Sequence, residues 1–142
     1  MAKTADEIRE ILQRQAARRR LAEQWAQEYA GCVVLRHDDS SNSARPWSGA
    51  VIHPSTRNPG RWQVTIFDAD GFAYDYSEPT QSDAIFEAMR SGHDIIDMGL
   101  LDRVGETPRF MAGVLWSQLP DSVKWRSDPR EIQRNLESKT AP

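Results

Sequence analysis

Histidines beside carboxylates are the residues of this chain whose types and spacing could support chemistry. His93 and Asp97 stand four residues apart in a segment with helical periodicity, a spacing that places two metal ligands on one helix face. His37 precedes Asp38 in a polar loop, which offers further nitrogen and oxygen ligands. A zinc site usually takes at least three ligands from the protein, and neither group has an evident third. We therefore expect no metal site, and we expect His93 or Asp94 to cap a helix near Gly92.

Nucleophilic catalysis and cofactor binding have no recognisable motif in the chain. The sequence contains no G-x-S-x-G, P-loop or G-x-G-x-x-G pattern. Its three histidines lie in different segments, and no acid pair stands in an apolar setting that would raise a carboxyl pKa. We expect a non-catalytic protein without a cofactor. The alternative that stays open is a small metal-dependent enzyme using His37, Asp38 or His93.

Charge is distributed unevenly along the chain. The segment from Ile66 to Glu106 carries ten acidic residues and two arginines, a net charge of −8, whereas the whole chain has a net charge of −3. The rest of the chain therefore carries +5. Such asymmetry bears on partners rather than on fold, and it favours an acidic surface that binds a basic protein.

Aromatic residues lie beside these acids, and the chain has five tryptophans. Trp47 and Trp125 stand between polar residues, where an exposed ring can anchor a partner. The predicted partner-binding residues are Asp68, Asp70, Phe72, Asp75, Glu78, Trp47 and Trp125.

Arginines in the first thirty residues support a different hypothesis, a regulator that binds nucleic acid directly. Arg14 and Arg18 are four residues apart and Arg19 follows, so a helix would present bases that can contact phosphates. Glutamates on the same helix dilute this charge, and we rank the hypothesis below the protein-binding one.

The first element is predicted to be a long amphipathic helix from Thr4 to Ala30. Thr4 and Glu7 fit a capping box at its start. Its apolar stripe is broken at Gln15 and Arg18, so we expect the helix to pack at its two ends or to meet a partner at its middle.

Strands are predicted at 32–36 and 47–53, followed by a hairpin over 61–76. Asp70-Gly71 favours a type I′ turn, because glycine adopts positive φ without steric cost. Apolar and polar residues alternate on both sides of this turn, which predicts one buried face. The alternating residues are Trp62, Val64, Ile66, Phe72, Tyr74 and Tyr76.

Short helices are predicted for the remainder of the chain, over 80–92, 94–104, 107–119 and 128–137. Strands and helices are segregated, which indicates an α+β fold with a long N-terminal helix and an antiparallel sheet of three to four strands. The length favours a single domain, 1–142. We expect a helix (1–30), a sheet region (31–78), a helical region (79–138) and a frayed tail (139–142).

The cellular setting is predicted to be the cytoplasm. No apolar stretch is long enough for a membrane span, and the N-terminus lacks the apolar segment of a secretory signal. The single cysteine, Cys32, lies in an apolar run and is interpreted as a small buried hydrophobe. The sequence leaves the oligomeric state open.

In its general character the chain is small, acidic and tryptophan-containing, with one domain and no catalytic motif. In this it resembles accessory proteins of phages and mobile elements, including inhibitors of host defence such as anti-CRISPR proteins. That resemblance implies an inhibitor whose acidic surface blocks a host nucleic-acid-binding complex.

Overall fold

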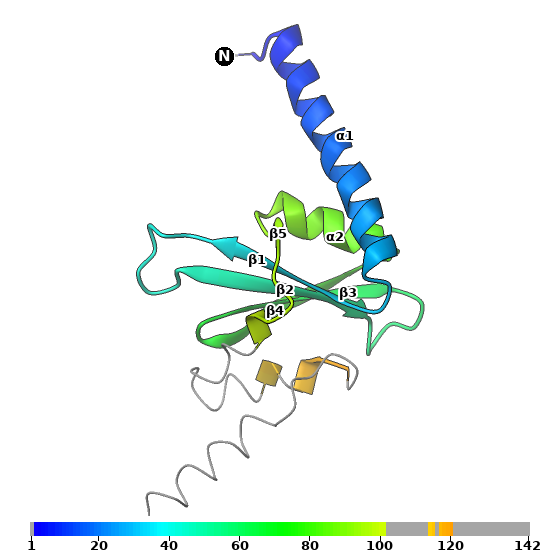
Figure 1. Cartoon of the computed structure of the whole chain (residues 1–142), viewed down its shortest axis with the longest axis vertical. Coiled ribbons are helices and arrows are strands. Elements are labelled where there is room, and N and C mark those ends of the chain that lie inside the picture. The colour runs from blue at the N-terminus through cyan, green and yellow to red at the C-terminus, as the bar shows by residue number, and fades with distance from the viewer. Residues whose placement is uncertain (1, 102–113, 116, 121–142) are drawn as a thin grey trace, which may run out of the picture.

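The computed structural model describes residues 2–101, 114–115 and 117–120. These residues form an α+β fold in which a five-stranded antiparallel sheet lies below two helices (Figure 1). Among the residues that the structure describes, no helix is long and apolar enough to cross a membrane.

Helix α1, Ala5–Glu28, begins at the predicted cap, where Thr4 Oγ1 accepts a hydrogen bond of 3.1 Å from the Glu7 amide. Its C-terminal half packs into the core through Leu21, Ala22 and Trp25. Its N-terminal half extends away from the body of the protein (Figure 1). The expectation of packing at both ends is therefore wrong within the described residues, because only the C-terminal end meets the core.

The sheet has one strand more than predicted. Its strands are β1 Val33–Asp38, β2 Trp47–Pro54, β3 Trp62–Asp68, β4 Gly71–Glu78 and β5 Ile95–Ile96, in the spatial order β4-β3-β2-β1-β5. All paired strands are antiparallel, and in this order β4 and β5 are the edge strands of the sheet that the described residues form.

Over the described residues 94–101 the helix predicted for 94–104 is wrong, because strand β5 forms there instead. Gly92 has a φ of +99°, which turns the chain at the end of the preceding helix and directs it back along β1. Ile95 and Ile96 are β-branched and pair with Arg36 and Leu35. His93 and Asp97 therefore do not share a helix face.

The β3–β4 hairpin forms, but not with the predicted turn. A type I′ turn needs positive φ at both central residues, and in this hairpin only Gly71, with φ +108°, has it. Ile66 pairs with Tyr74 while Phe67 pairs with Phe72, so Ala73 is the extra residue of a β-bulge. The bulge places Phe72 on the opposite face of the sheet from Tyr74, which corrects the predicted alternation.

Helix α2, Gln81–Arg90, confirms the helix predicted over 80–92 and covers one face of the sheet, where Ile85 packs with Leu35 and Ile52. The other face buries a second core around Phe67, Val34 and Val51. Four leucines pack there: Leu100, Leu101, Leu115 and Leu119.

Of the later predicted helices, only fragments fall within the described residues. Val114, Leu115, Ser117 and Gln118 are helical, inside the predicted helix 107–119. The predicted helix 128–137 and the predicted tail lie outside the described residues.

Gly49 leaves room for the Phe67 ring close to the backbone of β2, and this contact gives a direct test of the second core. A Cβ at Gly49 would overlap the Phe67 ring and lie 2.6 Å from Leu100 Cδ2. We predict that Gly49→Ala lowers the free energy of unfolding by about 1–3 kcal/mol, because overpacking a buried site forces its neighbours to shift. Urea unfolding measures the loss. Gly31→Ala is the control, since a Cβ there meets nothing within 4 Å; an equal effect of both substitutions would contradict the packing argument.

Candidate functional site

A groove between edge strand β4 and helix α2 gathers aromatic and charged side chains. Its volume is about 440 Å³. We call it the β4–α2 groove, and its lining residues are Tyr74, Tyr76, Glu78, Glu87, Arg90 and Ser91.

Strand alternation and the end of α2 build this groove. Tyr74, Tyr76 and Glu78 point to the same face because they are two residues apart on β4. The two tyrosine rings stack with centroids 6.5 Å apart and an interplanar angle of 23°. Tyr76 packs against the core, whereas the side chain of Tyr74 is 53% exposed. Exposed aromatic side chains are enriched at protein interfaces.

Negative charge accumulates in the groove. Partial burial raises the pKa of Glu78, and the charges of Glu87 and Asp83 raise it further, against a lowering effect of Arg61. Burial, with the nearby groups of Tyr74, Glu87 and Glu78, raises the pKa of Tyr76 to about 12. Glu87 forms an ion pair of 3.0 Å with Arg90. The lining thus holds two carboxylates and one arginine, a formal net charge of −1.

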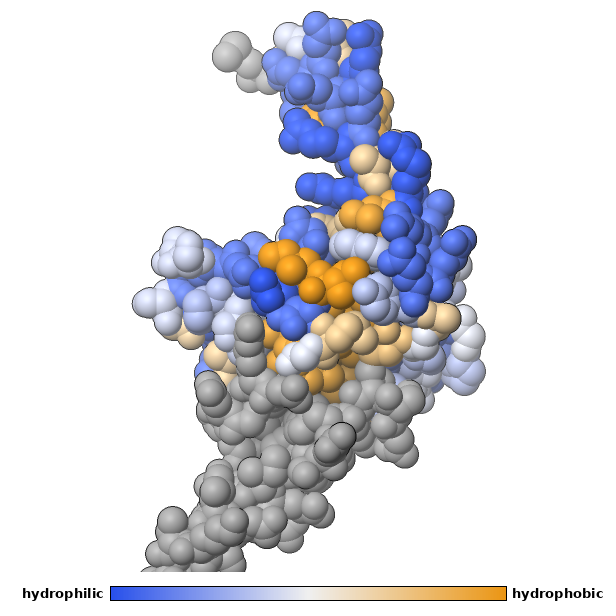
Figure 2. Space-filling view, viewed as in Figure 1, coloured by the Kyte–Doolittle hydropathy of each residue, from blue (hydrophilic) through white to orange (hydrophobic). Residues whose placement is uncertain are grey.

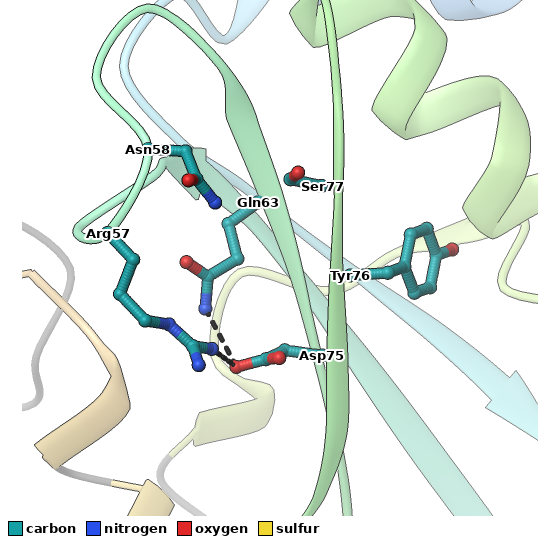
Figure 3. Close-up of a pocket in the computed structure, with 6 residues that line it drawn as sticks. All are labelled: Arg57, Asn58, Gln63, Asp75, Tyr76 and Ser77. Atoms are coloured by element: carbon teal, nitrogen blue, oxygen red, sulfur yellow. Dashed lines mark hydrogen bonds and ion pairs between the residues drawn. The ribbon is translucent and has the colours of Figure 1, made fainter.

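On the opposite face of β4 lies a polar cleft of about 300 Å³ (Figure 3). Arg57 and Asp75 point toward each other and form an ion pair, and Gln63 Nε2 donates to Asp75 Oδ2 at 3.1 Å. Behind them His53 Nε2 shares a hydrogen bond of 2.8 Å with the buried Thr65 hydroxyl. The polar side chains of this cleft therefore form hydrogen bonds and an ion pair with one another beside the sheet edge.

The structure separates the residues that the sequence grouped as one acidic surface. Asp68 and Asp70 lie at the hairpin tip, 3.8 and 3.2 Å from Arg45 Nε. Asp75 belongs to the polar cleft, and only Glu78 lines the β4–α2 groove.

Two predicted aromatic anchors are part of the second core. Trp47 and Phe72 pack against Phe67, with the Trp47 and Phe67 rings edge to face at a centroid distance of 5.9 Å. Trp125 lies outside the described residues. Sequence reasoning missed Tyr74, Tyr76 and Glu87 as site residues, although the alternation of the two tyrosines was visible.

The arginines of the nucleic-acid hypothesis also differ in their surroundings. Arg19 is engaged within the fold: it forms an ion pair of 2.7 Å with Asp83, and its guanidinium carbon lies 4.0 Å from the centre of the Phe86 ring. Arg14 and Arg18 lie on the exposed half of α1, with Arg14 3.8 Å from Glu10.

The histidines of the enzyme hypothesis form a compact cluster with Ser48. His93 Nε2 and Ser48 Oγ share a hydrogen bond of 2.8 Å, and the His37 and His93 rings lie 5.8 Å apart. Burial, followed by the charge of His37, lowers the pKa of His93 to about 4, so its imidazole is neutral at pH 7. Asp38 pairs instead with Arg36, at 2.9 Å.

No group of three potential metal ligands comes together within the described part of the chain. The thiol of Cys32 is a poor nucleophile at neutral pH, because burial raises its pKa to about 12. The histidine cluster joins β1, β2 and the chain after α2.

Comparisons with known proteins give no relative from which a function could be transferred. No protein-family model, no curated protein and no solved structure matches the chain.

The buried His93 predicts a loss of stability in mild acid. Its pKa of about 4 lies below the ordinary value of 6.5, so the unfolded chain binds the proton first as the pH falls. The free energy of unfolding is therefore unaffected by this histidine above pH 6.5. It falls by about 3 kcal/mol as the pH drops from 6.5 to about 4. We predict that His93→Gln flattens the pH dependence of the unfolding free energy across this window, as measured by urea titrations. An unchanged slope would contradict the burial of a neutral imidazole.

Proposed function

We propose that this protein is a non-catalytic protein-binding module that holds a basic, extended segment of its partner in the β4–α2 groove. The observation that carries the proposal is the stacked Tyr74–Tyr76 pair next to Glu78 and Glu87 on an edge strand. Together they supply aromatic contact area, negative charge and an accessible backbone.

The edge position of β4 supports binding by strand addition. β3 occupies one side of β4, and among the described residues no strand pairs with the other side. Unpaired backbone groups on a sheet edge can bind an extended peptide as an additional strand. The side chains of such a strand would alternate between the groove on one face and the polar cleft on the other.

The charge of the groove selects a basic segment. Lysine or arginine side chains would lie near Glu78 and Glu87, whose mutual repulsion they would relieve. The faces of Tyr74 and Tyr76 can also attract a cation. Pairing of β4 with β4 of a second copy is disfavoured, because it would bring the acidic side chains together.

A module of this kind would act as an inhibitor if its partner uses the same basic segment to bind nucleic acid. Basic segments contact phosphates, so occupation of such a segment by the groove excludes the nucleic acid. We therefore keep the sequence-based hypothesis of a phage or mobile-element inhibitor of a host nucleic-acid-binding complex as the specific form of this proposal.

The first test uses a fluorescent peptide in which lysine alternates with threonine. We predict that the protein binds it with an affinity that falls as salt increases, and that Glu78→Lys or Glu87→Lys raises the Kd by about tenfold through charge repulsion. Fluorescence anisotropy measures the Kd. Glu23→Lys, an exposed site on α1, is the charge-matched control and leaves the Kd unchanged. Equal effects of all three substitutions would show that binding depends only on net charge, against the proposed site.

A second test distinguishes strand addition from attraction by charge alone. Methylation of alternate backbone nitrogens removes the donors from one edge of the peptide and leaves the other edge intact. We predict that one of the two methylated peptides loses binding and the other retains it, because only one edge faces β4. If both peptides bind as the parent does, the groove holds its ligand without extending the sheet.

A further inference from the structure

The exposed half of α1 is a second surface without an assigned role. We call residues 5–18 the α1 arm. Every residue of the arm is exposed except Ile11, which is half-buried; Ile8 is 47% and Leu12 60% exposed. Figure 2 shows a mostly hydrophilic arm with small apolar patches that extends well beyond the body of the protein.

The apolar residues of the arm lie on one stripe. Ile8, Ile11 and Leu12 are three or four residues apart, so they share a face of the helix. The arm is about 21 Å long, and a separate helix of that length is marginal in water. Within the described residues its apolar stripe meets no other element, so its burial would add stability that the packed half of α1 does not supply.

The charges of the arm divide along its length. Asp6, Glu7 and Glu10 lie near its start, with Arg9 among them, and the two remaining charged residues of the arm, Arg14 and Arg18, are basic. Two copies aligned antiparallel would place the acidic part of each arm beside the basic part of the other. Two parallel copies would instead place like charges side by side.

We infer that two copies of this chain associate through their α1 arms as an antiparallel helix pair, with a twofold axis near Ile11 and Leu12. A twofold pair uses the same surface on both copies, which fits the self-complementary charge pattern. The arm extends away from the sheet, so the two bodies lie at opposite ends of the pair (Figure 1).

A nucleic acid explains the arm less well than a second copy does. Phosphates would be attracted to Arg14 and Arg18 but repelled by Glu7 and Glu10, and they would leave the apolar stripe in water. The arm and the β4–α2 groove share no residue, so this inference stands whether or not the groove binds a peptide. If both hold, a dimer presents two grooves, which would strengthen binding to a partner with repeated basic segments.

Sedimentation equilibrium of the full chain, from micromolar to millimolar concentrations, tests the inference. We expect a monomer–dimer equilibrium that weakens with salt, and a loss of the dimer in Ile8→Gln/Leu12→Gln. Glu7→Lys/Glu10→Lys replaces two acidic residues of the arm by basic ones, so that the two arms repel each other. This variant raises the dimer Kd by about tenfold or more. Circular dichroism checks that each variant keeps its helix, and Glu23→Lys is the control outside the arm.

Mixing gives the sharper result. Arg14→Glu/Arg18→Glu makes the arm acidic, so this variant alone is monomeric, and mixed with Glu7→Lys/Glu10→Lys it forms a heterodimer.

Disulfide cross-linking tests the antiparallel orientation. A chain with Ala5→Cys and a chain with Arg18→Cys join by oxidation in an antiparallel pair, whereas Ala5→Cys alone does not join to itself. A wild-type chain that stays monomeric, a dimer indifferent to the arm variants, or a monomer that binds duplex DNA through Arg14 and Arg18 would each overturn the inference.

Discussion

The middle of the sheet is apolar on both faces, and this constraint governs the rest of the fold. Neighbouring residues Val51 and Ile52 of β2 point to opposite faces, and both are fully buried. Helix α2 and the end of α1 cover one face, while Leu100 and Leu115 pack on the other. Among the described residues β4 keeps one edge without a paired strand, and the first half of α1 lies outside the core.

The bulge at Ala73 decides what the open edge presents. Without it, Phe72 would point to the same face as Tyr74 and Tyr76. With it, Phe72 joins the Phe67 core, and the two tyrosines are left beside helix α2. One extra residue thus anchors the hairpin tip in the second core through Phe72 and places Tyr74 and Tyr76 in the groove.

Folding pairs five of the ten acidic residues of the 66–106 segment with arginines from elsewhere in the chain. Arginines from the rest of the chain fold back onto the acidic segment and pair with its carboxylates. These pairs are Arg45 with Asp68 and Asp70, Arg57 with Asp75, Arg19 with Asp83, and Arg36 with Asp97. In the groove Glu87 is paired with Arg90, and Glu78 is the carboxylate for which a partner could supply a cation. A charge count along the sequence overstated the acidic surface, because ion pairs between distant segments are invisible in it.

The sequence by itself determined the elements that depend on neighbours along the chain. The Thr4 cap, helix α2, the hairpin and the α+β class follow from local hydrogen bonding and from periodicities of 3.6 and 2. Only the tertiary structure decided that Ile95–Ile96 forms a fifth strand, that Ala73 is a bulge, and that Tyr74, Tyr76, Glu78 and Glu87 share one groove. The physical reason is that strand pairing and helix docking join residues far apart in the chain, and their free energy depends on partners that no local pattern identifies.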